Sequence, residues 1–155
     1  MGADVVPATQ ARLLLFEVRG RRYACDLASV REIVPFGVVT RLPGAPAAVV
    51  GVSNVRGLVV TVVDLGIRLA DGPVDRAEGA VLLLEYGGKV LGAGVDGLQD
   101  VLVPEDGIQP PPADSGTGDT SGLLCGLVQT NGGVAVVLDP AALVKETLVG
   151  TGGDT

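Results

Sequence analysis

The sequence carries an internal repeat, and this repeat limits the possible folds more than any other feature. The two copies align at an offset of 68 residues in their first part and 75 residues in their second part. Matching positions are Gly20 and Gly88, Ile33 and Val101, Gly57 and Gly132, and Asp64 and Asp139. Glycine-rich hairpins resemble one another by chance. Here, however, turn, apolar and acidic positions recur in one order, which favours a duplication.

Each copy is predicted to consist of short strands joined by tight turns. Valine-rich stretches alternate with glycine-containing turns, a pattern typical of β-hairpins. The predicted strands cover 12–18, 21–27, 38–42, 49–55, 58–64, 80–86, 89–95, 98–103, 123–130 and 134–138. Apolar residues at helical spacing predict a two-turn helix over 27–34, and Pro140 begins a predicted helix over 140–148.

Two copies of a five-strand unit predict a mainly β fold: two small β-barrels packed side by side, each closed to protect its edge strands. We expect one domain over 12–148, with repeat halves 12–70 and 80–142 and flexible tails at 1–11 and 149–155. The expected division places 12–15, 36–78 and 139–148 in the first barrel and shares 16–35 and 79–138 between the two.

Composition excludes several kinds of chemistry. The chain has no His and only two Cys, so His-dependent nucleophile systems and His- or Cys-based metal sites are excluded. A net charge of −7 argues against a nucleic-acid or anionic-membrane binder, since both need a basic patch. No apolar run approaches the roughly 20 residues of a membrane-spanning helix. We therefore expect no cofactor, no metal, no nucleic acid and no direct membrane insertion.

The two cysteines, Cys25 and Cys125, both lie in apolar contexts, YACDL and LLCGL. They are a hundred residues apart in the sequence, which does not suggest the disulfide framework of a small secreted protein. Both are therefore predicted to be buried, inert thiols.

Two features would suit an enzyme or a ligand-binding protein instead. The string Gly92-x-Gly94-x-x-Gly97 fits a dinucleotide-binding fingerprint, but LQDVLVP follows it where that fingerprint requires a helix. The strand-end acids Asp64 and Asp139 could form a carboxylate pair, although their repeat symmetry favours capping of the turn or helix that follows each one. Small-molecule or enzymatic function stays a remote alternative.

Arg56 stands out at the tip of a predicted hairpin, within Asn54-Val55-Arg56-Gly57. Its counterpart in the second copy is Asn131, so the shared fold does not by itself require arginine. A guanidinium on a rigid turn beside apolar strands suits recognition of a partner.

Several motifs, in order, resemble the CheW-like domain family. GVSNVRGLVVTVVDL (51–65) resembles the family signature GVxNLRGxVxPVVDL, and LLFEVRGRRYACDLASVREIV (14–34) resembles its opening hairpin and V-x-E-I/V segment. TRLPGAPAAVVGVSN and VLGAGVDGLQDVLVPEDGIQPPP match two further family segments. The resemblance covers about residues 12–148. Thr61 and Val55 depart from the usual Pro and Leu, which indicates a divergent member.

The resemblance implies two SH3-like barrels and no catalysis. Proteins of this family couple chemoreceptors to the histidine kinase CheA in bacterial chemosensory arrays, so the implied partners are the cytoplasmic tip of a chemoreceptor and the regulatory domain of the kinase. The implied location is the cytoplasm, at membrane-associated receptor arrays. No appended kinase or receiver segment is visible in the 155 residues, so the stand-alone adaptor form is implied. An adaptor of a non-flagellar pathway, or one that binds receptor without kinase, stays open.

The resemblance also assigns receptor-side positions. Arg56 matches the arginine implicated in receptor contact, Glu32 and Val30 match positions on the same side, and Asn54 and Gly57 shape the turn. Three apolar residues are further expected contacts, with a core position equally open for each: Ile33, Ala80 and Val101.

Overall fold

The computed structural model describes residues 12–110 and 122–150. The expected tail at 1–11 lies outside the described residues, as does the part of the expected tail 149–155 that follows Gly150, the last residue of a helix. Ten strands form: β1 (Leu13–Val18), β2 (Arg21–Asp26), β3 (Val30–Pro35), β4 (Val49–Val55), β5 (Leu58–Asp64), β6 (Ala80–Tyr86), β7 (Lys89–Val95), β8 (Gly97–Leu102), β9 (Leu124–Thr130) and β10 (Gly133–Leu138). The helices are η1 (Leu27–Ser29), α2 (Leu65–Leu69), α3 (Pro140–Val144) and the π-helical η3 (Lys145–Gly150).

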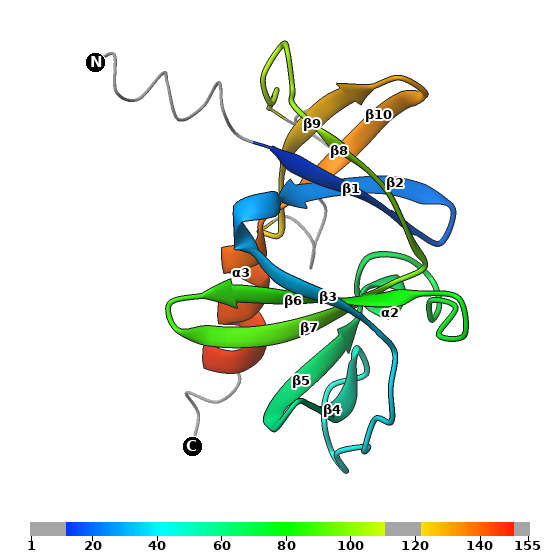
Figure 1. Ribbon diagram of the computed structural model, residues 1–155, viewed down its shortest axis with the longest axis vertical. Helices are drawn as coiled ribbons and strands as arrows, with labels where there is room; N and C mark the ends of the chain where they lie inside the picture. Colours follow the sequence, from blue (N-terminus) through cyan, green and yellow to red (C-terminus); the bar gives the residue numbers. More distant parts are fainter. Residues whose placement is uncertain (1–11, 111–121, 151–155) are drawn as a thin grey trace.

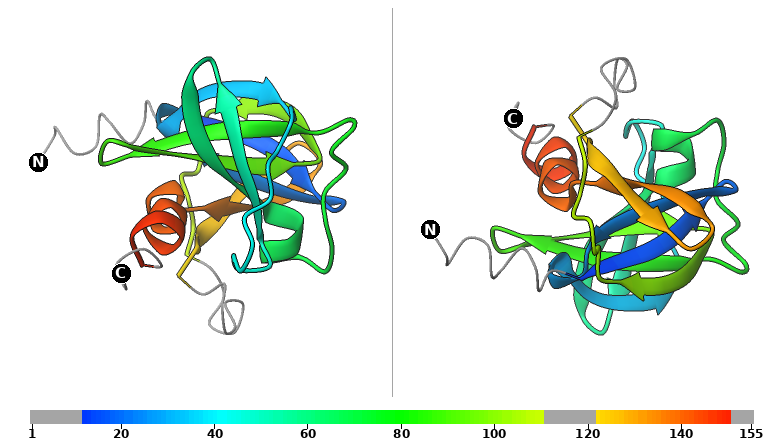
Figure 2. Two further views of the ribbon diagram at one scale, coloured as in Figure 1. Left: turned by 90° about the horizontal axis from the view of Figure 1, so that it is seen from below. Right: turned by 90° about the horizontal axis from the view of Figure 1, so that it is seen from above.

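The strands form two five-stranded sheets, which confirms the predicted mainly β fold. Barrel 1 has the order β3-β6-β7-β5-β4, and barrel 2 has the order β8-β1-β2-β10-β9. The two barrels occupy the lower and upper halves of the molecule, and α3 lies beside the β6–β7 hairpin (Figures 1 and 2).

Each barrel is closed by the chain that leaves an edge strand and bridges to the opposite edge. After β3, Thr40 exchanges two backbone hydrogen bonds of 2.8 Å with Val52 of β4. After β8, Gln109 makes the same exchange with Leu127 of β9. Val52 and Leu127 are equivalent at the offset of 75, and Gln109 follows the equivalent of Thr40 by one residue, so the repeat extends to the closure of each barrel.

Both copies of the repeat carry a glycine beside the closure, and a close approach of two backbone segments explains why. A Cβ on Gly51 would lie 2.0 Å from the Thr40 carbonyl oxygen, and Gly51 has a φ of 153°. A Cβ on the equivalent Gly126 would lie 2.6 Å from the Gln109 carbonyl oxygen. Both distances are shorter than any real Cβ contact, so only glycine fits where the closing segment crosses.

The two halves of the sequence exchange their first hairpins. The β1–β2 hairpin of the first copy joins β8, β9 and β10 of the second copy, while the β6–β7 hairpin of the second copy joins β3, β4 and β5 of the first. Parallel pairings of β2 with β10 and of β7 with β5 hold these hairpins in place. The expected division of the chain differs here, because β1 (Leu13–Val18) lies in barrel 2 and not with 36–78.

The exchanged hairpins are buried on both faces and form the contact between the barrels. In β1, Leu13 and Leu15 point into barrel 2, while Leu14, Phe16 and Val18 belong to a larger cluster between the barrels. The inter-barrel cluster also takes in Tyr23, Leu82, Leu84, Leu91 and Leu143. Burial on both faces accounts for the continuous apolar run of β1, since neither face is left for polar residues.

The predicted helix over 27–34 was wrong. Residues 27–29 form one 3-10 turn, and Val30–Pro35 form β3, which pairs with β6. A bulge between Val30 and Glu32 shifts the register, so Val30 and Ile33 face the same side of the strand. Because of this bulge, two apolar residues three positions apart lie on one side of the strand, as they would in a helix. The apolar periodicity therefore predicted a helix where a strand forms. The predicted strand over 38–42 is likewise reduced to the single bridge at Thr40.

Candidate partner-binding site

The Arg56 turn is a tight two-residue connection between β4 and β5. Arg56 and Gly57 have φ values of 51° and 91°, the left-handed conformations of a type I′ turn. The Asn54 side-chain oxygen accepts a hydrogen bond of 2.8 Å from the Gly57 amide. Arginine seldom adopts positive φ, so the turn holds Arg56 in a conformation that glycine or asparagine would adopt more easily.

Arg56 forms an ion pair with Glu32 of β3. Because β3 and β4 are the two edge strands of barrel 1, this pair crosses the gap between them, which we call the seam of barrel 1. The Arg56 side chain is 66% exposed and the Glu32 side chain 34%. An ion pair this open to solvent stabilises a protein by about 0–1 kcal/mol, so its guanidinium stays accessible to a partner at little cost.

The seam opens onto a hollow of about 250 Å³. Its floor is apolar, with Val34 of β3, Val60 and Val62 of β5 and Leu83 of β6, and Arg56 lies at its rim. These lining residues were not among those predicted from the sequence. The alternation of β5 could have placed Val60 and Val62 on one face, but only the barrel closure shows that this face adjoins the seam.

The remaining site residues lie on a different face. Val30 and Ala80 are half-buried and pack against the inter-barrel cluster. Ile33 pairs with Leu82 and is 38% exposed, and Val101 of β8 pairs with Leu14 and is 45% exposed. Since Leu82 and Leu14 belong to the inter-barrel cluster, register places Ile33 and Val101 at the edges of the face between the barrels.

The eight expected site residues therefore fall into two groups. Arg56, Glu32, Asn54 and Gly57 meet at the seam, while Val30, Ile33, Ala80 and Val101 follow the face between the barrels. Of the latter, Ile33 and Val101 are exposed, so the core alternative does not hold for these two.

The strand-end acids act as helix caps, as their repeat symmetry predicted. Asp139 accepts hydrogen bonds from the Ala141 and Ala142 amides at the start of α3. Asp64 is fully buried and accepts from the Ile67 amide at 3.1 Å at the start of α2. Each carboxylate thus has a local structural role in its own copy.

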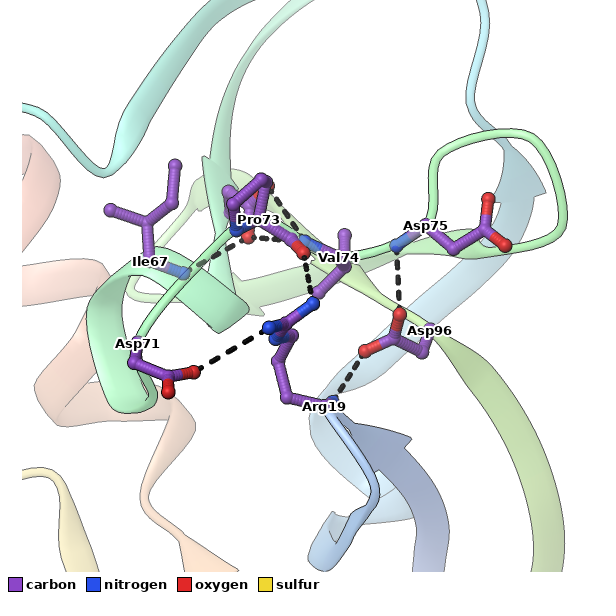
Figure 3. A network of polar contacts seen from close by, with 8 residues as sticks. Arg19, Ile67, Asp71, Pro73, Val74, Asp75 and Asp96 are labelled. Carbon is purple, nitrogen blue, oxygen red and sulfur yellow. Dashed lines mark hydrogen bonds and ion pairs between the residues drawn. The ribbon is translucent and has the colours of Figure 1, made fainter.

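Asp64 and Asp96 also organise the connection between α2 and β6, and Figure 3 shows Val74, Asp75 and Asp96 there. Asp64 accepts from the Val74 amide and from the Arg76 guanidinium at 3.3 Å. Asp96 accepts from the Asp75 amide at 2.7 Å and from the Arg19 amide of the β1–β2 turn. This network fixes the connection of barrel 1 against a turn of barrel 2, because it joins residues from both.

The glycine string is a packing feature of strands and not a nucleotide loop. Gly92 and Gly94 lie inside β7, and β8 follows where a phosphate-binding helix would have to begin. A Cβ on Gly94 would lie 2.5 Å from the Phe36 ring. The glycines therefore allow close packing against the strand.

The cysteines differ from each other. Cys25 is buried as predicted, and its burial, with the nearby Asp26 carboxylate, raises the pKa of the thiol to about 12. Cys125 is exposed, which contradicts the predicted burial. β9 is an edge strand, so alternate side chains of an apolar segment point outward there. Partial burial and Asp139 still raise the Cys125 pKa.

Within residues 12–110 and 122–150, no three His, Cys, Asp or Glu side chains gather as a metal site would require. The helices of the same segments are all too short or too polar to cross a bilayer.

These features define a double-barrel protein of two SH3-like units, whose candidate site is an open surface carrying one ion pair and several apolar side chains. A family model described as the CheW-like domain matches residues 12–148. The chain therefore belongs to the CheW-like domain family.

Named relatives agree with this family. The chain is 36% identical over 101 residues to a chemotaxis protein CheW of Klebsiella aerogenes, a match that covers 64% of this chain and 61% of that protein. It is 35% identical over 102 residues to a probable chemotaxis protein CheW of Rhizobium etli, with 64% of this chain and 66% of that protein covered. A chemotaxis protein CheW of Bacillus subtilis is 32% identical over 106 residues, with 67% and 68% covered. In the first two relatives the match thus spans less than two thirds of the protein.

A solved structure has the same fold. The scaffolding protein TtCheW of Thermoanaerobacter tengcongensis superposes with a TM-score of 0.74 at 24% identity, covering 83% of each chain.

Proposed function

We propose that this chain is an adaptor that couples chemoreceptors to the histidine kinase CheA in a bacterial chemosensory array. Membership of the CheW-like domain family supports the general role, and relatives named chemotaxis protein CheW support the pathway. The observation that carries the proposal is the Arg56–Glu32 pair, an accessible guanidinium held across the seam of barrel 1.

The proposed mechanism is binding without catalysis. The receptor tip, an α-helical coiled coil in this family, contacts the Arg56 turn and the exposed apolar residues Ile33 and Val101. Helix recognition of this kind needs apolar anchors and a few positioned charges. A second surface binds the regulatory domain of the kinase, and simultaneous binding raises the effective concentration of receptor and kinase for each other. The proposed location is the cytoplasm, at receptor arrays.

The test compares two charge reversals in barrel 1. Binding of purified wild type, Arg56→Glu and the control Lys89→Glu to a receptor tip fragment is measured by calorimetry. Lys89 is exposed at the start of β7, so its reversal makes the same change in net charge away from the seam. Arg56→Glu places two carboxylates at the seam and is expected to weaken receptor binding about tenfold or more, or about 1.4 kcal/mol.

Equal receptor affinities of wild type and Arg56→Glu would contradict the receptor site. A parallel titration with the kinase regulatory domain separates the two adaptor roles. Receptor binding without kinase binding would replace the coupling role by that of an adaptor that engages receptors alone.

A further inference from the structure

The turn between β9 and β10 carries the pair Asn131-Gly132. An asparagine side chain loses its amide group most readily before glycine, because no side chain shields the backbone nitrogen that attacks it. Both residues are exposed. The chain has one other asparagine, Asn54, beside the equivalent turn of the first copy, so the two hairpins offer a comparison within one molecule.

The two asparagines are held differently. The Asn54 side-chain oxygen accepts a hydrogen bond of 2.8 Å from the Gly57 amide, and the β-branched Val55 follows Asn54 and crowds the nitrogen next to it. In the part of the chain that the structure describes, neither the Asn131 carboxamide nor the Gly132 amide makes a hydrogen bond. The groups that would react are therefore restrained at Asn54 and unrestrained at Asn131.

The β9–β10 turn also lacks the conformation of its counterpart. Arg56 and Gly57 have the positive φ values of a type I′ turn, whereas in the segment 131–133 only Gly133 has a positive φ, of 143°. A type I′ turn would require positive φ at Asn131 and Gly132. The backbone that follows Asn131 is thus not fixed in that turn, and two successive glycines give it the widest choice of conformations.

A guanidinium lies directly against this turn. Arg22 of β2 is half-buried, and a Cβ built on Gly132 would lie 2.7 Å from its Nη1 nitrogen and closer still to Nη2. Within residues 12–110 and 122–150, the Arg22 guanidinium has no ion-pair or hydrogen-bond partner. Its counterpart in the other copy is Val90, which packs against the interior of barrel 1. The fold therefore does not require an arginine at this position.

We propose that Asn131 is a self-modification site, at which Arg22 assists the loss of the side-chain amide. The Gly132 backbone nitrogen gives its proton to hydroxide and attacks Cγ of Asn131. The nitrogen–Cγ bond forms, the bond from Cγ to the amide nitrogen breaks, and that nitrogen leaves as ammonia with a proton from water. Water then opens the five-membered ring at one of its two carbonyls, which gives aspartate or isoaspartate. Negative charge develops on the attacking nitrogen and on the Cγ oxygen, and the adjacent guanidinium stabilises it.

The product adds a negative charge to the end of barrel 2. Asn131 also lines the hollow of about 220 Å³ that carries Glu105 and Asp106. The new carboxylate is repelled by these two acids on one side of the turn and attracted to Arg22 on the other. Because Arg56 occupies the equivalent position of barrel 1, the modification gives the two barrels opposite charges at matching turns.

The test follows the purified, folded full chain during incubation at neutral and at mildly alkaline pH. Peptide mass spectrometry locates the exchange of NH₂ for OH, and an isoaspartyl methyltransferase labels any isoaspartate. We expect the change at Asn131 and not at Asn54, at a rate that rises with pH because the attacking nitrogen must lose its proton. A synthetic peptide with the sequence of residues 129–134 serves as the control that the assay detects the reaction.

The matched variants test the role of Arg22. Arg22→Gln is expected to slow the reaction about fivefold, the effect of one unit charge about 4 Å away in water. Lys89→Gln makes the same change in net charge at the start of β7 and should leave the rate unchanged. Arg22→Lys keeps the charge and should restore most of the rate. If Arg22→Gln fails to fold, high salt replaces it, since screening should slow the wild type and leave the 129–134 peptide unaffected.

Three outcomes would overturn the proposal. The first is an Asn131 that stays intact in the folded chain while the peptide reacts. The second is an equal rate for wild type and folded Arg22→Gln, which would leave an ordinary labile pair without assistance. The third is modification of Asn54 as fast as that of Asn131, which would show that the restraints seen at Asn54 do not matter.

Discussion

The two barrels are built on one plan, yet their seams carry different chemistry. In barrel 1, Arg56 reaches across to Glu32 above a largely apolar hollow of about 250 Å³. At the equivalent positions barrel 2 has Asn131 and Asp100, and its hollow of about 220 Å³ is lined by Glu105 and Asp106. The geometry of the seam was duplicated, while the arginine was not.

This comparison separates what the fold requires from what a partner requires. The closing glycine and the strand-end acid occur in both copies, because each barrel must close and each following helix must be capped. Where equivalent positions carry different residues, as Arg56 and Asn131 do, the fold does not require either residue. Differences between the copies are therefore the better guide to function.

The largest predicted effect tests the shared closure. Gly51→Ala forces a Cβ onto the Thr40 carbonyl in a backbone conformation that alanine avoids, and we expect a loss of about 3 kcal/mol or more in unfolding free energy. Gly126→Ala meets the Gln109 carbonyl and the movable Ile108 side chain, so its loss should be smaller, about 2 kcal/mol. Urea unfolding measures both. Gly37→Ala, where a Cβ meets no atom within 4 Å, serves as the control.

The next effect tests the two helix caps. Asp64→Ala removes a fully buried acceptor from the Ile67 and Val74 amides and from Arg76, with an expected loss of about 3 kcal/mol. Asp139→Ala removes an ordinary cap from α3 and should cost about 1 kcal/mol. Thermal unfolding of both variants checks the order. Equal losses would show that the Val74 and Arg76 contacts of Asp64 add nothing.

A smaller effect concerns the seams themselves. A double-mutant cycle of Arg56→Ala and Glu32→Ala should give a coupling energy of about 0.2–1 kcal/mol, as expected for an exposed pair. Asn131→Arg should create a similar coupling with Asp100, measured by the cycle with Asp100→Ala. A coupling of zero at barrel 2 alone would mean that its seam has lost the geometry as well as the residue.

The last prediction concerns the two cysteines, whose ionisation has the smallest effect on stability at neutral pH. Their equivalents in the other copy are Ala93 and Val50. With a pKa raised to about 12, buried Cys25 should resist alkylation at pH 8 in the folded protein, while Cys125 reacts. The folded state keeps the Cys25 proton longer than the unfolded chain. The contribution of this thiol is therefore present below pH 9 and lost as the pH rises toward 12.

Alkylation rates and an alkaline unfolding series of wild type and Cys25→Ala measure these two effects. Rapid labelling of Cys25 at pH 8 would show that barrel 2 opens readily around β2.

Local features of this fold could be predicted from the sequence because their signals are local. The turns at Arg19-Gly20 and Arg56-Gly57 and the caps at Asp64 and Asp139 depend on a few neighbouring residues. The strand β3 could not be predicted from the sequence, because a bulge after Val30 gives this strand the apolar spacing of a helix.

Which strands belong to which barrel could not be predicted from the sequence, for a different reason. The hairpins 13–26 and 80–95 have the same pattern of apolar residues and turns, so either could complete either sheet. In the same way Arg56 and Glu32 were both recognised, but their contact depends on the closure of barrel 1, which no short segment encodes.

The exchange of hairpins has a consequence for how the protein is made. As the chain leaves the ribosome, β1 and β2 are synthesised first, yet their sheet is completed only by β10, which ends at residue 138. Barrel 1 needs nothing beyond residue 95 for its five strands and can therefore assemble earlier. One face of the β1–β2 hairpin can pack on barrel 1 at that stage, but the face of Leu13 and Leu15 has no partner until β9 and β10 are made. The newborn chain therefore passes through a stage in which one barrel is formed and the interior face of the other is unprotected.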